Sequence, residues 1–81
     1  MKIVVQLFAR ARDLAGSDTV MITLPEGATT GDLRRELATQ YPRLARLLEH
    51  SALAVNRDFA DDHLSLPLGV EVALLPPVSG G

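Results

Sequence analysis

Apolar and polar residues alternate near both ends of this chain, at positions 2–8 and 70–75, and this alternation constrains the fold more than any other feature. Side chains of a strand point alternately to its two faces, so alternation with a period of two predicts a strand with one buried and one wet face. Gln6 marks the wet face of the first segment, and Glu71 marks that of the last. The residues expected on the buried faces are Ile3, Val5 and Leu7, followed by Val70, Val72 and Leu74. A sheet of this kind needs a second layer on its buried side only.

The middle of the chain is predicted to supply that layer as a helix. Thr29 or Thr30 is suited to cap its N-terminus, and Asp32 adds a negative charge to its first turn. The apolar stripe of the helix is Leu33, Leu37 and Tyr41, and a second helical stretch at positions 42–49 adds Leu44, Leu47 and Leu48. We also expect a helical turn at 9–15, strands at 19–24 and 51–56, turns at 56–58 and 60–62, and renewed alternation at 64–68. The order of strand, strand, helix and further strands indicates an α+β domain with one main helix on one sheet face.

Size and composition exclude several classes of function. With 81 residues and no cysteine, the chain is expected to form one domain that is held together by apolar packing, to which 47% of its residues contribute. The net charge of −2, with both signs interspersed, argues against nucleic acid or an anionic membrane as a partner. The sequence contains neither a membrane-spanning stretch nor a signal peptide, so a cytoplasmic location is expected.

No group of residues has the spacing of a catalytic site. His63 lies beside Asp61 and Asp62, but without cysteine this cluster is interpreted as a solvated acidic loop rather than a metal site. His50 is isolated, and the serines and glycines match neither a nucleophile elbow nor a phosphate-binding loop. We therefore expect no catalytic side chains and no metal site in this chain.

The last six residues, Pro76-Pro77-Val78-Ser79-Gly80-Gly81, form an unusual terminus. The two prolines end the preceding strand and favour an extended chain, while Gly80 and Gly81 carry no side chain that would block a narrow channel. The terminus is therefore either a loose end or a device that delivers the Gly81 carboxylate into the active site of another protein.

Three apolar residues are predicted to be exposed near this terminus. Leu75 shares the wet face of Glu71, Phe8 shares that of Gln6, and Phe59 lies in a polar segment that is expected to be a turn. They form one protein-binding patch if the first and last strands are neighbours, which alternation alone leaves open.

Three segments of the chain carry the motifs of a known family. The segments Leu7–Gly16 (LFARARDLAG), Ala54–Asn56 (AVN) and Glu71–Gly81 (EVALLPPVSGG) resemble those of the small subunit of molybdopterin synthase, a ubiquitin-like sulfur carrier of the MoaD/ThiS type. The resemblance implies a β-grasp fold over residues 1–75, with the first and last strands side by side and parallel, and a flexible Gly-Gly tail over residues 76–81.

The resemblance also implies a mechanism and a set of partners. An E1-like enzyme would use ATP and Mg²⁺ to adenylate Gly81, and a sulfurtransferase system would convert the acyl-adenylate into a thiocarboxylate. The tail, with Gly80 beside the reacting carbonyl, would then deliver sulfur to cyclic pyranopterin monophosphate in the large subunit, within a heterotetramer of two small and two large subunits. This chain would be a non-catalytic sulfur-donor subunit that stably binds no cofactor, and Phe8, Phe59, Leu75, Pro76, Pro77, Val78 and Ser79 would contact its partners.

One segment departs from the family. Leu68-Gly69-Val70 replaces the usual Asp-Gly-Asp turn, which keeps the glycine and removes two negative charges. Two alternatives stay open: a carrier for thiamine synthesis, tRNA thiolation or cysteine synthesis, and a ubiquitin-like interaction module whose tail is never activated.

Overall fold

A computed structural model describes residues 1–75 of the chain. The strands are β1 (Lys2–Leu7), β2 (Thr19–Thr23), β3 (Ala52–Val55), β4 (Asp58–Ala60) and β5 (Val72–Leu75). The helices are α1 (Ala9–Ala15), α2 (Thr30–Gln40) and α3 (Ala45–Leu48), and a 3-10 turn, η1 (Pro42–Leu44), links the last two. The extended tail predicted at positions 76–81 lies outside the described residues.

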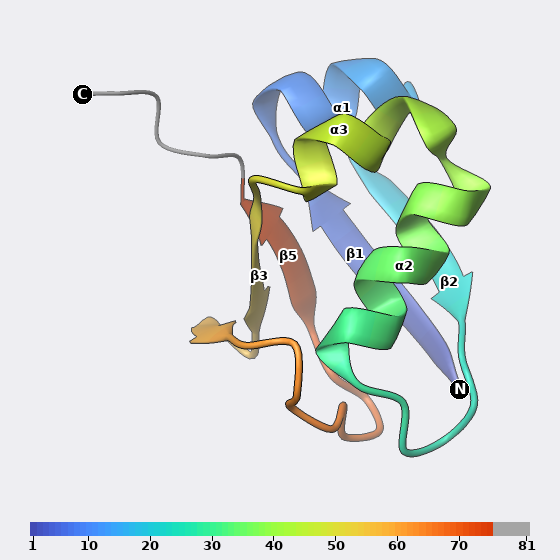
Figure 1. The fold of residues 1–81 in the computed structure, drawn as a ribbon, viewed down its shortest axis with the longest axis vertical. Helices are drawn as coiled ribbons and strands as arrows, with labels where there is room; N and C mark the ends of the chain where they lie inside the picture. The colour runs from blue at the N-terminus through green and yellow to red at the C-terminus, as the bar shows by residue number, and fades with distance from the viewer. Residues whose placement is uncertain (76–81) are drawn as a thin grey trace.

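The strands form one mixed five-stranded sheet in the order β2-β1-β5-β3-β4 (Figure 1). β1 and β5 come from opposite ends of the described chain, yet they pair in parallel at the centre of the sheet, with Leu7 opposite Leu74. The remaining pairs are antiparallel. This is the β-grasp topology, so the predicted fold and the predicted neighbourhood of the first and last strands are both confirmed.

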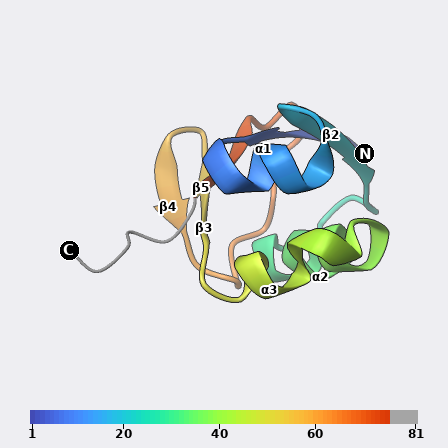
Figure 2. The ribbon, with the colours of Figure 1, turned by 90° about the horizontal axis from the view of Figure 1, so that it is seen from above.

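The helices lie on one side of the sheet and leave its other face open (Figure 2). The alternation of β1 is confirmed, because its side chains are alternately exposed and buried from Lys2 to Leu7. β5 likewise buries Val72 and Leu74 completely. The apolar stripes of the helices meet these strands, and the fully buried members include Leu33, Leu37, Leu44 and Leu48. Burial of each such side chain contributes about 1.5–3 kcal/mol, so this one layer of packing accounts for the fold without disulfides.

The main helix begins at the predicted cap. The Thr29 hydroxyl accepts a hydrogen bond from the backbone N–H of Asp32, and the Asp32 carboxylate accepts one from the backbone N–H of Thr29, which completes a capping box. The hydrogen bonds from the Thr29 backbone and hydroxyl, together with the Arg35 guanidinium, hold the pKa of Asp32 below its ordinary value. The start of α2 is therefore set locally at its first turn.

Arg34 connects α2 to the segment that leads into β3. Its guanidinium donates to the carbonyl oxygens of Leu48 at 2.5 Å and Ser51 at 2.9 Å, and it forms an ion pair with Asp62 at 3.3 Å. These carbonyls lie at and just after the end of α3, where backbone acceptors lack helical partners. One side chain of α2 thus fixes the entry into the sheet strand that pairs with β5.

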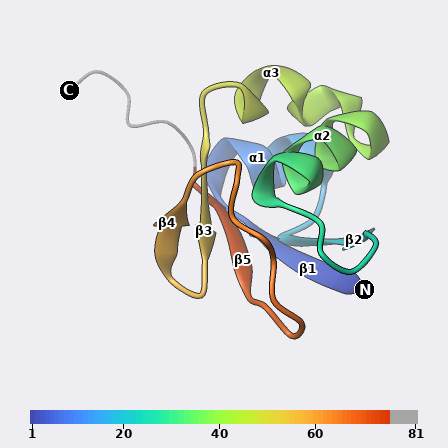
Figure 3. The ribbon, with the colours of Figure 1, turned by 60° about the horizontal axis from the view of Figure 1, so that its bottom comes forward.

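The segment between β3 and β5 differs from the sequence prediction. Phe59 was expected in a turn but lies in the short strand β4, because the turn is completed within Asn56 and Arg57, whose φ angles are 50° and 72°. The alternation at 64–68 does not make a regular strand: Leu66 is buried, while Leu64 and Leu68 are exposed. Its backbone contacts instead the loop before α2, where Leu66 donates to Ala28 (Figure 3).

The glycine turn that precedes β5 is present. Gly69 has a φ of 70°, a backbone conformation that favours glycine, so the turn is kept although leucine and valine flank it. No helix within residues 1–75 is long and apolar enough to cross a membrane.

Candidate functional site

The open face of the sheet gathers side chains from four strands. Gln6, Ala73, Ala54 and Phe59 are paired in a row across the four strands. In the next row on the same face, Leu75 is paired with Ala52. Phe8 lies beside Leu75 in this row if the parallel register of β1 and β5 is continued by one residue. Phe8, Leu75, Ala52, Ala54, Ala73 and Phe59 are called the apolar face below. The face is continuous because its two rows of side chains are neighbours on the same side of the sheet.

Phe8 is positioned by the junction between β1 and α1. Its backbone stays extended, with a φ of −129°, so the alternation along β1 continues and the Phe8 side chain lies on the open face. Ala9 then adopts a φ of 51°, in the left-handed region, and turns the chain into α1. Phe8 remains 44% exposed, which is unusual for a large aromatic side chain in an otherwise well-packed domain.

Phe59 is positioned by the hairpin of β3 and β4. It lies opposite Ala54, whose small side chain is 7% exposed, while Phe59 itself is 78% exposed. Asn56 fixes this hairpin to the start of β5: its backbone N–H donates to the Glu71 carbonyl, and its side-chain oxygen accepts from the Glu71 N–H at 3.1 Å. The role of Asn56 was missed from the sequence, although an asparagine in a tight turn is a typical signal for it.

Leu75 ends β5 and marks the point from which the terminal segment departs. Its strand is hydrogen-bonded to β1 on one side and to β3 on the other, and the preceding Leu74 is fully buried. Leu75 itself is only partly exposed, since Ala52 and Phe8 flank it. The structure therefore brings Phe8, Leu75 and Phe59 onto one face. Parity predicted that face for Phe8 and Leu75, gave no place to Phe59, and left open whether the three converge. The remaining predicted site residues, Pro76, Pro77, Val78, Ser79, Gly80 and Gly81, lie outside the described part of the chain.

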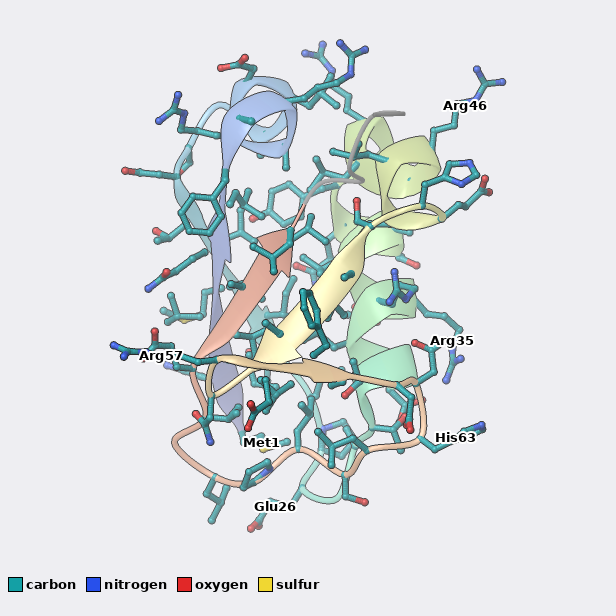
Figure 4. The ribbon with its side chains drawn as sticks, turned by 90° about the vertical axis from the view of Figure 1, so that its left-hand side faces the viewer. Met1, Glu26, Arg35, Arg46, Arg57 and His63 are labelled. Atoms are coloured by element: carbon teal, nitrogen blue, oxygen red, sulfur yellow. The ribbon has the colours of Figure 1, made fainter. Side chains whose placement is uncertain are left out.

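The acidic loop after β4 makes contacts within itself and with α2. Asp61 accepts a hydrogen bond from the backbone N–H of His63 at 2.8 Å, Asp62 pairs with Arg34, and the imidazole of His63 is exposed (Figure 4). Across residues 1–75, no three His, Cys, Asp or Glu side chains converge in a way that could hold a metal ion. The loop therefore has a structural role next to the first turn of α2.

Three small residues of the apolar face were also missed from the sequence. Ala52, Ala54 and Ala73 form the floor between the larger side chains. Alanine gives no periodic signal of its own, but in this register it keeps the face flat enough for another protein surface to approach.

Fold and site together define a ubiquitin-like domain that presents its C-terminal strand end beside an exposed apolar sheet face. A protein-family model described as the ThiS family matches residues 5–81. The chain therefore belongs to the ThiS family.

Individual relatives agree with this assignment. The molybdopterin synthase sulfur carrier subunit of Dictyostelium discoideum is 38% identical over 78 residues, which cover 93% of this chain and 91% of the relative. Among solved structures, SAMP1 from Haloferax volcanii has a TM-score of 0.87 at 32% identity, with full coverage of both chains. The complex of subunits 1 and 2 of the molybdopterin-converting factor from Helicobacter pylori contains a chain with a TM-score of 0.71 at 26% identity, again with full coverage of both chains.

Proposed function

We propose that this protein is the sulfur carrier subunit of molybdopterin synthase and acts in molybdenum cofactor biosynthesis. The observation that carries the proposal is the apolar face, which surrounds the end of the central strand β5, directly before the six-residue terminus that ends in Gly80 and Gly81. Relatives named as sulfur carrier subunits of this synthase, 38% identical in Dictyostelium discoideum and in Escherichia coli, support the choice of pathway. The other sulfur-carrier pathways and the inactive interaction module are not favoured by these relatives.

The chemistry takes place at the Gly81 carboxylate. A carboxylate is a poor electrophile at neutral pH, so an E1-like enzyme with ATP and Mg²⁺ first forms the Gly81 acyl-adenylate and releases pyrophosphate. A sulfur nucleophile supplied by a sulfurtransferase then attacks the acyl carbon, the C–O bond to AMP breaks, and a thiocarboxylate results. The chain contains no cysteine, so the terminus is the place where it would carry sulfur.

The large subunit of the synthase is the proposed acceptor. The apolar face would be buried against it, in a heterotetramer of two small and two large subunits, while the terminus enters its active site and passes sulfur to cyclic pyranopterin monophosphate. The relative from Helicobacter pylori, which is described in complex with its subunit 2, supports a partner of this kind. Gly80 and Gly81 allow the acceptor to close around the reacting carbonyl, and Pro76 and Pro77 reduce the entropy lost on insertion.

Intact-mass spectrometry tests the carrier function. Incubation with the activating enzyme, ATP, Mg²⁺ and a sulfur donor should raise the mass of the protein by the difference between one sulfur and one oxygen atom. Deletion of Gly81, or addition of one residue after it, should abolish this product and leave the urea midpoint unchanged. If the wild-type protein acquires no sulfur under conditions that load a known carrier, the proposal is wrong.

A further inference from the structure

A hollow between α1, η1 and α3 is lined by basic side chains that the proposed function does not use. Arg10 reaches it from α1, Arg43 from η1 and Arg46 from α3, and His50 follows at the end of the helical stretch. Glu49 is the acidic residue on its rim. This set of residues is called the basic hollow below. Its members come from segments far apart in the sequence, so only the fold brings their charges together.

Within residues 1–75, no ion pair involves the three arginines of the basic hollow, which outnumber the single acidic residue on its rim. The ion pairs of this part of the chain involve Arg34 and Arg35, and no side chain of the basic hollow donates a hydrogen bond there. The whole protein carries a net charge of −2, so the hollow is a local concentration rather than a reflection of a basic composition. Like charges that gather without partners on one surface create a positive potential suited to an anionic partner surface.

The basic hollow lies at the end of the sheet from which the terminus departs. Arg10 follows Phe8 by two residues, and His50 precedes Ala52 by two residues. Phe8 and Ala52 flank Leu75 on either side in the sheet register. Arg46 accordingly lies at the opposite end of the molecule from Met1 and Glu26 (Figure 4). The basic hollow itself lies among the helices, on the opposite side of the sheet from the apolar face, so a partner that covers the apolar face and receives the terminus would reach the hollow around this end of the sheet.

The lining of the hollow favours a protein surface over a nucleic acid. Leu14 and Leu47 are partly buried between the arginines and provide an apolar floor. Among the described residues, the lining contains no Phe, Tyr or Trp on which a base could stack, and the imidazole of His50 is its one ring. An acidic segment with an apolar side chain matches the arginines and the apolar floor between them.

We propose that the basic hollow docks an acidic surface segment of the molybdopterin synthase large subunit, next to the channel that receives the Gly-Gly terminus. This inference rests on the proposed function. The apolar face provides most of the buried area, whereas the basic hollow steers the two proteins together and fixes their orientation. Its charges therefore act mainly on the association rate and on the salt dependence of binding.

Association kinetics with the large subunit from the same organism test this role. The variants are Arg46→Glu and the double variant Arg43→Glu/Arg46→Glu, and Arg57→Glu is the matched control. Arg57 is exposed like Arg46, gives the same change of charge on reversal, and lies away from Arg46 at the β3–β4 turn (Figure 4). At low salt, the double variant should associate about tenfold more slowly than wild type. The difference should vanish near 1 M salt, where the Debye length falls to about 3 Å. Arg57→Glu should stay within about twofold of wild type.

Three results would overturn the inference. One is an unchanged association rate for the double variant, and another is an equal loss for Arg57→Glu, which would indicate a general effect of net charge. The third is a double variant that binds the large subunit normally but loses retention by immobilised polyphosphate, which would assign the basic hollow to a polyanion. In each case a wild-type protein that still binds the large subunit and transfers sulfur leaves the proposed function intact. A wild-type protein that does neither contradicts both proposals.

Discussion

Replacement of Phe59 by serine should separate partner binding from folding. Phe59 is 78% exposed in the isolated domain. An aromatic side chain buries about 150–250 Å² in an interface, so about 150 Å² of Phe59 is available to a partner. At about 25 cal/mol per Å² this area sets a ceiling of about 4 kcal/mol on the loss of binding free energy. Ordering and desolvation reduce that ceiling, and a loss of about 2 kcal/mol is typical of an aromatic anchor. We therefore expect Phe59→Ser to weaken binding of the large subunit about thirtyfold.

The same substitution should barely affect folding. Phe59 covers part of Ala54, and β4 is a short edge strand, so the loss of unfolding free energy is limited to about 1 kcal/mol, the span of strand propensities. Leu68→Ser is the matched control, because Leu68 is 68% exposed and lies in the loop before β5, at the other end of that strand from Leu75. Isothermal titration calorimetry with the large subunit measures binding, and urea unfolding measures stability.

Two outcomes would refute this reasoning. If Phe59→Ser lowers the unfolding free energy by much more than about 1 kcal/mol, Phe59 contributes to the fold and its exposure has been misinterpreted. If Phe59→Ser and Leu68→Ser weaken binding equally, the partner recognises exposed apolar residues in general rather than the apolar face.

Three further predictions concern stability. Arg34→Met should lower the unfolding free energy by about 2–3 kcal/mol in urea titrations, since two backbone carbonyls lose a charged donor; full retention of stability would mean that water replaces it. Hydrogen bonds lower the pKa of Asp32 in the folded state, so its contribution to stability is complete above the unfolded pKa of about 3.9 and disappears as the pH falls through the folded pKa. The difference in unfolding free energy between wild type and Asp32→Asn should therefore shrink as the pH is lowered from the unfolded to the folded pKa. A difference that stays constant over these pH values would contradict the lowered pKa of Asp32. Leu74→Ala should cost about 2–5 kcal/mol of stability, whereas Leu75→Ala should cost less and weaken partner binding instead. A larger stability loss for Leu75→Ala than for Leu74→Ala would mean that Leu75, rather than Leu74, faces the core.

The strands at both ends of the chain could be predicted because alternation determines which side chains share a face. Val5 and Val72 were assigned to the core from parity alone, and the structure buries both completely. Parity does not determine which strands are neighbours. The convergence of Phe8 and Leu75 therefore required the parallel pairing of β1 with β5, which the structure provides.

The segment from 56 to 70 could not be predicted in the same way, because its one strand is short and the residues after that strand pair with a distant loop. Phe59 belongs to a strand of three residues, too short to show a period. Leu66 alternates with its neighbours like a strand residue, but its segment joins neither edge strand of the sheet, and its N–H donates instead to the Ala28 carbonyl. Apolar periodicity indicates which side chains are buried. A strand must also pair with the backbone edge of another strand, and where such an edge lies is determined by the complete topology.

The central position of β5 explains how one strand serves both the fold and the terminus. A terminus that left from an edge strand would be anchored by hydrogen bonds on one side only, and insertion into a partner could detach that strand. β5 is paired with β1 and β3, and its inward side chains Val72 and Leu74 are fully buried. Its outward residues, Ala73 and Leu75, take no part in that core and stay available to a partner. Binding can therefore cover one face of the strand and act on its end without disturbing the packing on the other face, which is why substitutions on the two faces should separate binding from stability.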